Sequence, residues 1–453
     1  MDSGGWFLAA GNRSHLMTDQ DSAHVIAALA ALLISAHAFG YLFARARQPQ
    51  VIGEILGGLV LGPTVLARLW PSAHDWLFPA SGVTPAVLAA VTQLGLLLLM
   101  FTAGTQMRGF LNRSAARTVV AVSVAGLVIP FSAGLVACAT VDLTRYHGVA
   151  HDAEAFLLVF AIAIAVTSIP VISRIMLDLG LLRTRFASIV LTVAVIEDVV
   201  LYVVLAVAIG LVTSDQGSAF GLAGVLGLEP SSTANSAYHT AVTVGFLGLS
   251  LLCGPTLYRR LLHSRFNLVE RRSPIGFQLV VMLLLSTACL LLGIVPLFGG
   301  FVAGIVVATA RAEKAESART EISHVSLGLF IPVYFAMVGL KLDLIDNFDP
   351  IFFLGFLTFA CTIKSLSVFA AARLAGESRI SASNLAVAMN ARGGPGIVLA
   401  STAYAAGIVD ARFYAALVML AIVTSLMAGT WLERTVAHLP AHEMVGEALT
   451  ESP

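Results

Sequence analysis

The chain has 453 residues, of which 58% are hydrophobic and only 11% are charged, and its formal net charge is zero. Soluble domains are about a quarter charged, so a soluble protein of this composition could not cover its surface with polar groups. The composition therefore excludes an ordinary soluble enzyme and a nucleic-acid-binding protein. It predicts an all-α integral membrane protein, with the lipid bilayer as its solvent.

Apolar segments taken in chain order predict about thirteen transmembrane helices, because each span needs about 20 mostly apolar residues. The first run begins near Ala23 and follows Asp19 and Asp21, whereas basic residues would precede a cleavable signal, so we expect a span. The segment 216–228 is apolar but glycine-rich and short, and we expect it to be a loop. The predicted spans are residues 22–44, 51–67, 84–105, 116–139, 155–176, 186–212, 236–258, 274–294, 295–310, 322–341, 350–373, 382–407 and 412–432.

Basic residues fall mainly on alternate connections of this layout. By the positive-inside rule, this asymmetry predicts an N-terminus outside and a C-terminus in the cytoplasm of a prokaryotic inner (plasma) membrane. Residues 1–436 are expected to form one multi-pass transporter domain, and residues 437–453 a short cytoplasmic tail. The basic residues on the cytoplasmic side are Arg45 and Arg47; Arg108, Arg113 and Arg117; Arg174, Arg183 and Arg185; Arg259, Arg260, Arg265, Arg271 and Arg272; Arg311, Lys314 and Arg319; Arg373 and Arg379; and Arg434. The outer side holds Arg13, Arg68, Arg145, Lys341 and Arg412.

A weak internal repeat relates the two halves of the chain. The copies are seven predicted helices apart, and because seven is odd they lie upside down relative to each other in the membrane. Inverted repeats are typical of secondary transporters. The matching segments are residues 94–104 with 327–339, and Gly57, Gly58 and Gly62 with Gly299, Gly300 and Gly304.

Two adjacent acids, Glu197 and Asp198, lie about twelve residues inside the sixth predicted span, which places them roughly 18 Å deep, near mid-bilayer. A charge there costs on the order of 3 kcal/mol. A structural ion pair that only fixes helix packing is one explanation. The other, which we favour, is a binding site where a carboxylate holds either a proton or a dehydrated Na⁺ or K⁺, with Asp198 as the metal ligand.

Adjacent residues on a helix point about 100° apart, so one acid can bind the ion while the other pairs with a cation on a neighbouring helix. Lys364, in the middle of the predicted span 350–373, is the only lysine at membrane depth and is expected to be that partner.

Two predicted spans contain helix breakers. In 155–176, Pro170 interrupts the helix, and the hydroxyls of Thr167 and Ser168 can bind freed backbone groups or offer oxygens to an ion. In 382–407, the breakers are Gly393, Gly394 and Pro395. The breaks share the seven-helix offset of the repeat, and paired interrupted helices mark a transporter's binding site.

Two polar residues precede the second break. Arg392 is expected to neutralise the negative ends of the broken helices rather than contact the transported ion. Asn390 offers an amide to the site, or else packs.

Together these residues resemble the monovalent cation:proton antiporter superfamily, and within it the second family, which includes the Kef-type and NapA-type proteins. The resemblance covers nearly the whole chain. It rests on residues 48–63, Thr167 to Pro170, Glu197-Asp198, residues 330–343, Lys364 and Arg392-Gly393.

The resemblance implies an NhaA/NapA-like antiporter fold with two broken crossing helices, and a homodimer whose dimerisation part and mobile core part interleave along the chain. It implies an elevator-type exchange of Na⁺ or K⁺ for H⁺, with Asp198 as the essential carboxylate and Glu197 paired with Lys364. Glu197 stands where the family usually has Asp, Asn or Gln.

The sequence also admits other functions. The main alternative is a proton-coupled exporter of an organic cation or ionophore on the same scaffold. A cation channel is a weaker alternative, because the buried acids and symmetric helix breaks suit alternating access better than a continuous pore. Neither an intramembrane enzyme nor a resident cofactor is expected, and no nucleotide-binding domain, because no matching motif is present. The four cysteines, Cys138, Cys253, Cys289 and Cys361, lie in apolar runs without metal spacing and are expected to be small buried apolar side chains.

Overall fold

The computed structural model describes residues 18–46, 48–106, 116–168, 171–172, 176, 181, 184–213, 233–262, 264, 267–310 and 312–435. Within these residues the backbone is helical, and its one β-bridge joins His147 and Val409. The predicted all-α class is confirmed. The predicted loop at 216–228 and the tail at 437–453 lie outside the described residues.

The helices of the first half begin and end as follows. In chain order they are α1 (Asp19–Arg45), α2 (Gln50–Leu61), α3 (Leu66–Leu69), α4 (Pro71–Leu77), α5 (Val83–Gln106), α6 (Ala116–Thr140), the 3-10 turn η2 (Thr144–Tyr146), α7 (Ala153–Ala165) and α9 (Arg185–Thr213).

The second half continues in the same manner. Its helices are α11 (Thr233–Leu262), α12 (Leu268–Arg272), α13 (Pro274–Leu291), α14 (Pro296–Ala308), α15 (Glu313–Val325), the π-helical turn η3 (Ser326–Phe330), α16 (Ile331–Leu340), α17 (Pro350–Ala375), α18 (Arg379–Ala388), α19 (Gly393–Ala405) and α20 (Ala411–Thr435).

Ten helices among the described residues are long and apolar enough to cross a membrane. Two of the predicted spans instead contain shorter apolar helices, α7 and α14, and the predicted span 382–407 is divided into α18 and α19. Every predicted span thus contains a helix, while the count of thirteen crossings stays a prediction.

The predicted span 322–341 is longer than expected. Its helix begins at Glu313 and runs without interruption through α15, η3 and α16. The assignment of Lys314 and Arg319 to a loop is therefore wrong. Acidic residues in the first turn suit the positive end of a helix, and the Arg319 guanidinium donates to carbonyls near the end of α14, so the charged turns are stabilised as helix.

The cysteine prediction is wrong for most positions. Cys289 is buried, but Cys138 and Cys361 are partly exposed and Cys253 is exposed. An outward-facing cysteine costs little here because a spanning helix turns one face to lipid, which is as apolar as the protein interior.

Equivalent helices of the two halves pack in equivalent ways. α2 packs on α16, and α5 packs on α14. At each contact a glycine allows close approach: a Cβ on Gly58 would lie 1.9 Å from the Ala336 carbonyl oxygen, and a Cβ on Gly304 would lie 2.1 Å from that of Phe101. The glycines that mark the repeat in the sequence are therefore the points where the two halves interlock.

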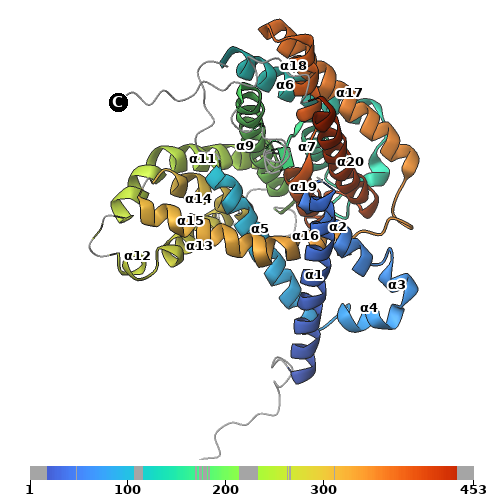
Figure 1. Ribbon diagram of the computed structural model, residues 1–453, viewed down its shortest axis with the longest axis vertical. Helices are drawn as coiled ribbons and strands as arrows, with labels where there is room; N and C mark the ends of the chain where they lie inside the picture. The colour runs from blue at the N-terminus through green and yellow to red at the C-terminus, as the bar shows by residue number, and fades with distance from the viewer. Residues whose placement is uncertain are drawn as a thin grey trace, which may run out of the picture.

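The helices form two groups. The interlocked group contains α1, α2, α5, α13, α14, α15 and α16, with α11 beside it. The other, which we call the core group, contains α6, α7, α9 and α17 to α20. Figure 1 shows α6, α17, α18 and α20 together at the upper right and α11 to α15 on the left, with α9 between them.

A polar cluster ties the ends of the core group together. Glu377, in the turn between α17 and α18, accepts hydrogen bonds from Arg185 at the start of α9 (2.7 and 3.1 Å) and from Thr118 of α6 (2.7 Å). Burial alone would raise the pKa of Glu377, but the hydrogen bonds from Arg185, Thr118 and Ser381 outweigh it and hold the pKa below its ordinary value.

We predict that Glu377→Gln lowers the thermal midpoint of the purified protein by a few degrees, because it removes a buried charge-assisted cluster worth about 1.5–3 kcal/mol. Since the folded-state pKa lies below the unfolded value, this stabilisation is present at neutral pH and is lost as the pH falls through the folded pKa. The difference in thermal midpoint between wild type and variant should therefore disappear as the pH is lowered. Glu321→Gln, at an exposed position outside the first turn of α15, is the control; an equal loss in both variants would contradict the assignment.

Candidate ion-binding site

The two interrupted helices cross in the middle of the core group. α7 ends at Ala165, and the backbone of Val166 is extended. The chain then lies against the gap between α18 and α19: the Thr167 hydroxyl donates to the Met389 carbonyl (2.5 Å), and the Ser168 amide donates to the Ala391 carbonyl (2.6 Å). Each break thus satisfies backbone groups that the other leaves free.

Gly393 makes this close approach possible. It has a positive φ of 23°, and a Cβ there would lie 2.1 Å from Val171 Cγ2 and 2.8 Å from Ser168 Oγ. Gly394 has far more room, because its nearest atom would be Phe335 Cζ at 3.9 Å. Gly394 and Pro395 form the buried first turn of α19, where a proline needs no amide partner.

Arg392 caps the end of α7. Its guanidinium donates to the carbonyls of Ala163 (3.1 Å) and Ile164 (2.9 Å), and to that of Ala360 on α17 (3.2 Å). The residue is 1% exposed. The predicted neutralisation of a broken-helix end is present in the structure, and the guanidinium is occupied by structural partners.

Asn390 is likewise occupied. Its amide nitrogen donates to Ser365 Oγ and to the Ala386 carbonyl, each at 2.8 Å, and its side-chain oxygen accepts from Arg392 at 3.2 Å. Of the two roles considered for Asn390, the geometry favours packing and orientation of Arg392.

Lys364 and Glu197 form a fully buried ion pair, with Nζ 2.6 Å from Oε1 and neither side chain exposed. The ammonium also donates to the carbonyls of Gly126 on α6 (2.8 Å) and of Ala165, the last residue of α7. The predicted pairing is present. Lys364 uses all three donors, and it caps the same helix end as Arg392.

Asp198 lies one residue farther along α9 and has different surroundings. It is completely buried, and neither carboxylate oxygen has a hydrogen-bond partner among the described residues. A buried unpartnered carboxylate is costly unless a proton or a cation occupies it. The crossing therefore holds one acid whose charge is compensated by Lys364 and one buried acid without a described protein partner.

The structure brings most of the predicted site residues together at this crossing: Glu197, Asp198, Thr167, Ser168, Lys364, Asn390, Arg392, Gly393, Gly394 and Pro395. Pro170 lies outside the described residues. Sequence reasoning missed Tyr202, whose hydroxyl is buried without a partner within the described chain. Its spacing of one helical turn from Asp198 was the available signal.

Inverted repeats and two interrupted helices that cross at buried charges define the class of secondary transporters. Residues 28–438 match the family described as "Sodium/hydrogen exchanger, transmembrane", and the chain belongs to this family. The prediction of a transporter rather than an enzyme is confirmed by that membership.

Similar proteins include two of nearly the same length. The "Na(+)/H(+) antiporter NhaS4" of Synechocystis is 26% identical over 92% of this chain and 98% of its own length. The "Na(+)/H(+)-K(+) antiporter GerN" of Bacillus cereus is 24% identical over 90% and 95%. The "K(+)/H(+) antiporter 1" of Saccharomyces cerevisiae is 26% identical over 85% of this chain, which spans only 43% of that relative. Other curated relatives are also matched over less than half their length.

Among solved structures, that of the sodium proton antiporter MjNhaP1 from Methanocaldococcus jannaschii matches with a TM-score of 0.62 and 16% identity, covering 94% of this chain and 100% of that chain. At this identity the match supports the fold alone, and it supports the antiporter fold predicted from the sequence.

We predict that Lys364→Met destabilises the protein far more than the double variant Glu197→Gln, Lys364→Met. Removing one partner of a buried pair leaves an uncompensated charge, at a cost of about 3–5 kcal/mol, whereas removing both charges does not. Thermal unfolding in detergent, followed by size-exclusion chromatography, measures the difference. A double variant no more stable than the single one would show that the ion pair is not the source of the loss.

A second prediction concerns the crossing itself. Gly393→Ala should displace the Thr167–Ser168 segment and lower both the thermal midpoint and the transport rate, because its Cβ meets neighbouring atoms and its φ is positive. Gly394→Ala is the matched control, and its Cβ meets no atom closer than 3.9 Å. Equal behaviour of the two variants in the same assays would contradict the steric argument.

Proposed function

We propose that this protein exchanges a small monovalent cation, Na⁺ or K⁺, for protons across a prokaryotic inner membrane, with Asp198 as the binding carboxylate. The observation that carries the proposal is the contrast between the two adjacent acids. Glu197 is neutralised by Lys364, while both oxygens of the buried Asp198 are free of protein partners in the described chain.

Competition at one carboxylate couples the two fluxes. A proton on Asp198 removes the negative charge that holds the cation, and a bound cation excludes the proton. Oxygens are the ligands that such ions prefer. Thr167 and Ser168 are proposed to add hydroxyl oxygens, since a hydroxyl that donates one hydrogen bond still has lone pairs to offer.

The printed names of the relatives agree with a monovalent cation and differ over which one. NhaS4 is named for Na⁺, the yeast protein for K⁺, and GerN for both. These names favour inorganic cation exchange over export of an organic cation or ionophore.

Transport is proposed to proceed by an elevator-type movement of the core group against the interlocked group in a homodimer. The core group carries Asp198 and both interrupted helices, so it would move as one body with the ion. The orientation, with the N-terminus outside, rests on the distribution of basic residues. The assignment to the second antiporter family rests on the sequence motifs.

We predict that purified protein in liposomes with a pH-sensitive dye will move protons in response to Na⁺ or K⁺ under an imposed proton gradient. Asp198→Asn should abolish this response while leaving the protein folded, because an amide can neither release a proton nor bind a cation by charge. Dye dequenching for each of Li⁺, Na⁺ and K⁺ is the measurement.

The control is Glu316→Gln, which removes an exposed acid away from the crossing and should leave the response intact. If no monovalent cation elicits a response from the folded wild type, inorganic cation exchange is excluded, and an organic substrate becomes the next test.

A further inference from the structure

A pocket lies between the two helix groups on the predicted outer side of Asp198. Its walls come from α5, α14 and α16 of the interlocked group and from α19 and α20 of the core group. By the predicted orientation all five helices place it in the outer half of the membrane. At about 160 Å³ it has room for several water molecules.

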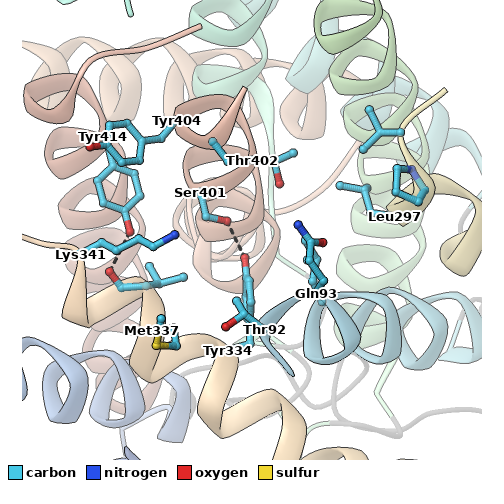
Figure 2. A pocket seen from close by; sticks show the side chains of 15 residues that line it. Thr92, Gln93, Leu297, Tyr334, Met337, Lys341, Ser401, Thr402, Tyr404 and Tyr414 are labelled. Carbon is cyan, nitrogen blue, oxygen red and sulfur yellow. Dashed lines mark hydrogen bonds between the residues drawn. The ribbon is translucent and has the colours of Figure 1, made fainter. Parts of the chain in front are cut away.

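The pocket floor is a hydroxyl contact between the two groups. Tyr334 of α16 and Ser401 of α19 are joined by a hydrogen bond of 2.6 Å, drawn as a dashed line in Figure 2. Tyr202 of α9 does not itself line the pocket, but it interacts electrostatically with both Tyr334 and Asp198. Thr402 also lines the pocket, and its hydroxyl has no hydrogen-bond partner among the described residues. A water molecule or a hydrated ion would find polar groups on this wall.

Lys341 is the one residue of the pocket lining that carries a full charge near neutral pH. It stands at the C-terminal end of α16, exposed at the pocket mouth, and has no ion-pair partner in the described part of the chain. The nearest acids in sequence, Asp343 and Asp346, lie beside Arg68 at 3.8 and 2.6 Å. No carboxylate lines the pocket to offset the ammonium.

We propose that this pocket is the outer access chamber for the hydrated monovalent cation and that Lys341 is its charge filter, which lowers cation occupancy from the outer side. This inference rests on the proposed function. A fixed positive charge at the mouth raises the energy of an entering cation. It also opposes a proton that is relayed along hydroxyl groups and water, because the relay moves the same unit charge, so the filter lowers occupancy by positive charge from outside and is measured here through the cation.

The filter has a pH limit. Protein atoms around the ammonium displace water and lower the pKa of Lys341, although the residue as a whole is exposed. Its charge is present below that pKa and is lost as the outer pH rises through it. The other titratable groups that line the chamber are Tyr334, Tyr404 and Tyr414.

The test compares right-side-out and everted membrane vesicles that contain wild type or Lys341→Gln. We expect the variant to lower the apparent KM for the cation on the outer face by about five- to tenfold, the effect of one charge across roughly 10 Å at an intermediate dielectric. The KM on the cytoplasmic face should change less than twofold. As the outer pH rises, the outer KM of the wild type should approach that of Lys341→Gln.

Two further variants separate charge from structure. Lys341→Arg keeps the charge and should keep the wild-type KM on both faces. Because arginine stays charged at alkaline pH, its outer KM should not approach that of Lys341→Gln as the outer pH rises. Arg412→Gln removes an exposed outer charge that does not line the pocket and should change little. An unchanged outer KM in Lys341→Gln, or an equal change on both faces, overturns the filter while exchange itself persists. Failure of the proposed function looks different, because wild type would then show no cation-dependent proton movement to compare.

Discussion

The structure depends on a solution to one problem: charges and open helix ends must be held where neither water nor lipid can satisfy them. An interrupted helix exposes carbonyls that carry a partial negative charge. Lys364 and Arg392 each donate to carbonyls at the end of α7, and Lys364 also pairs with Glu197. The breaks thus stabilise the cations, and the cations stabilise the breaks, so neither feature is tenable at this depth without the other.

This arrangement decides which of the two acids keeps its oxygens free of described protein partners, and it supports the role proposed for Asp198. Lys364 is fully engaged with Glu197 and two carbonyls, and Arg392 is engaged with carbonyls of three residues on α7 and α17 and with Asn390. Neither Lys364 nor Arg392 donates a hydrogen bond to Asp198 in the described chain. If Asp198 binds the transported ion as proposed, a structural cation beside it would compete with that ion for the same oxygens. Because the fixed cations are confined to the helix ends, the Asp198 oxygens have no such competitor in the described chain.

Most of the fold and much of the site could be predicted from the sequence. Composition and hydropathy predicted the helices, and helix breakers in two spans predicted the interruptions, while their crossing was implied by the family resemblance. The shortage of other lysines at membrane depth pointed to Lys364 as a partner for one of the two acids, and the resemblance assigned that acid as Glu197. The early start of the helix at Glu313 could not be predicted, since its charged turns are stabilised by α14, a tertiary contact.

Other features escaped prediction for the same reason. The Glu377 cluster joins α6, α9 and the α17–α18 turn, and only the folded chain shows that its partners meet. Tyr202 and Tyr334 read as ordinary aromatic residues in apolar helices. The Tyr334 hydroxyl acquires meaning only when α16 lies beside α19, and the buried Tyr202 hydroxyl only when α9 is packed in place, and a hydropathy pattern encodes neither contact.

The strength of contacts differs within and between the helix groups in a way that suits relative movement. Inside the core group the links are charge-assisted: the buried ion pair, the capped helix end and the Glu377 cluster. Near the outer pocket the groups are joined by neutral hydroxyl bonds, Tyr334 to Ser401 and Tyr414 to the Val338 carbonyl. A neutral bond contributes about 0.5–1.5 kcal/mol net, whereas breaking a buried charge pair costs about 3–5 kcal/mol. A displacement would therefore break the contacts between the groups first, and it would carry the crossing, with Asp198 inside it, as a unit.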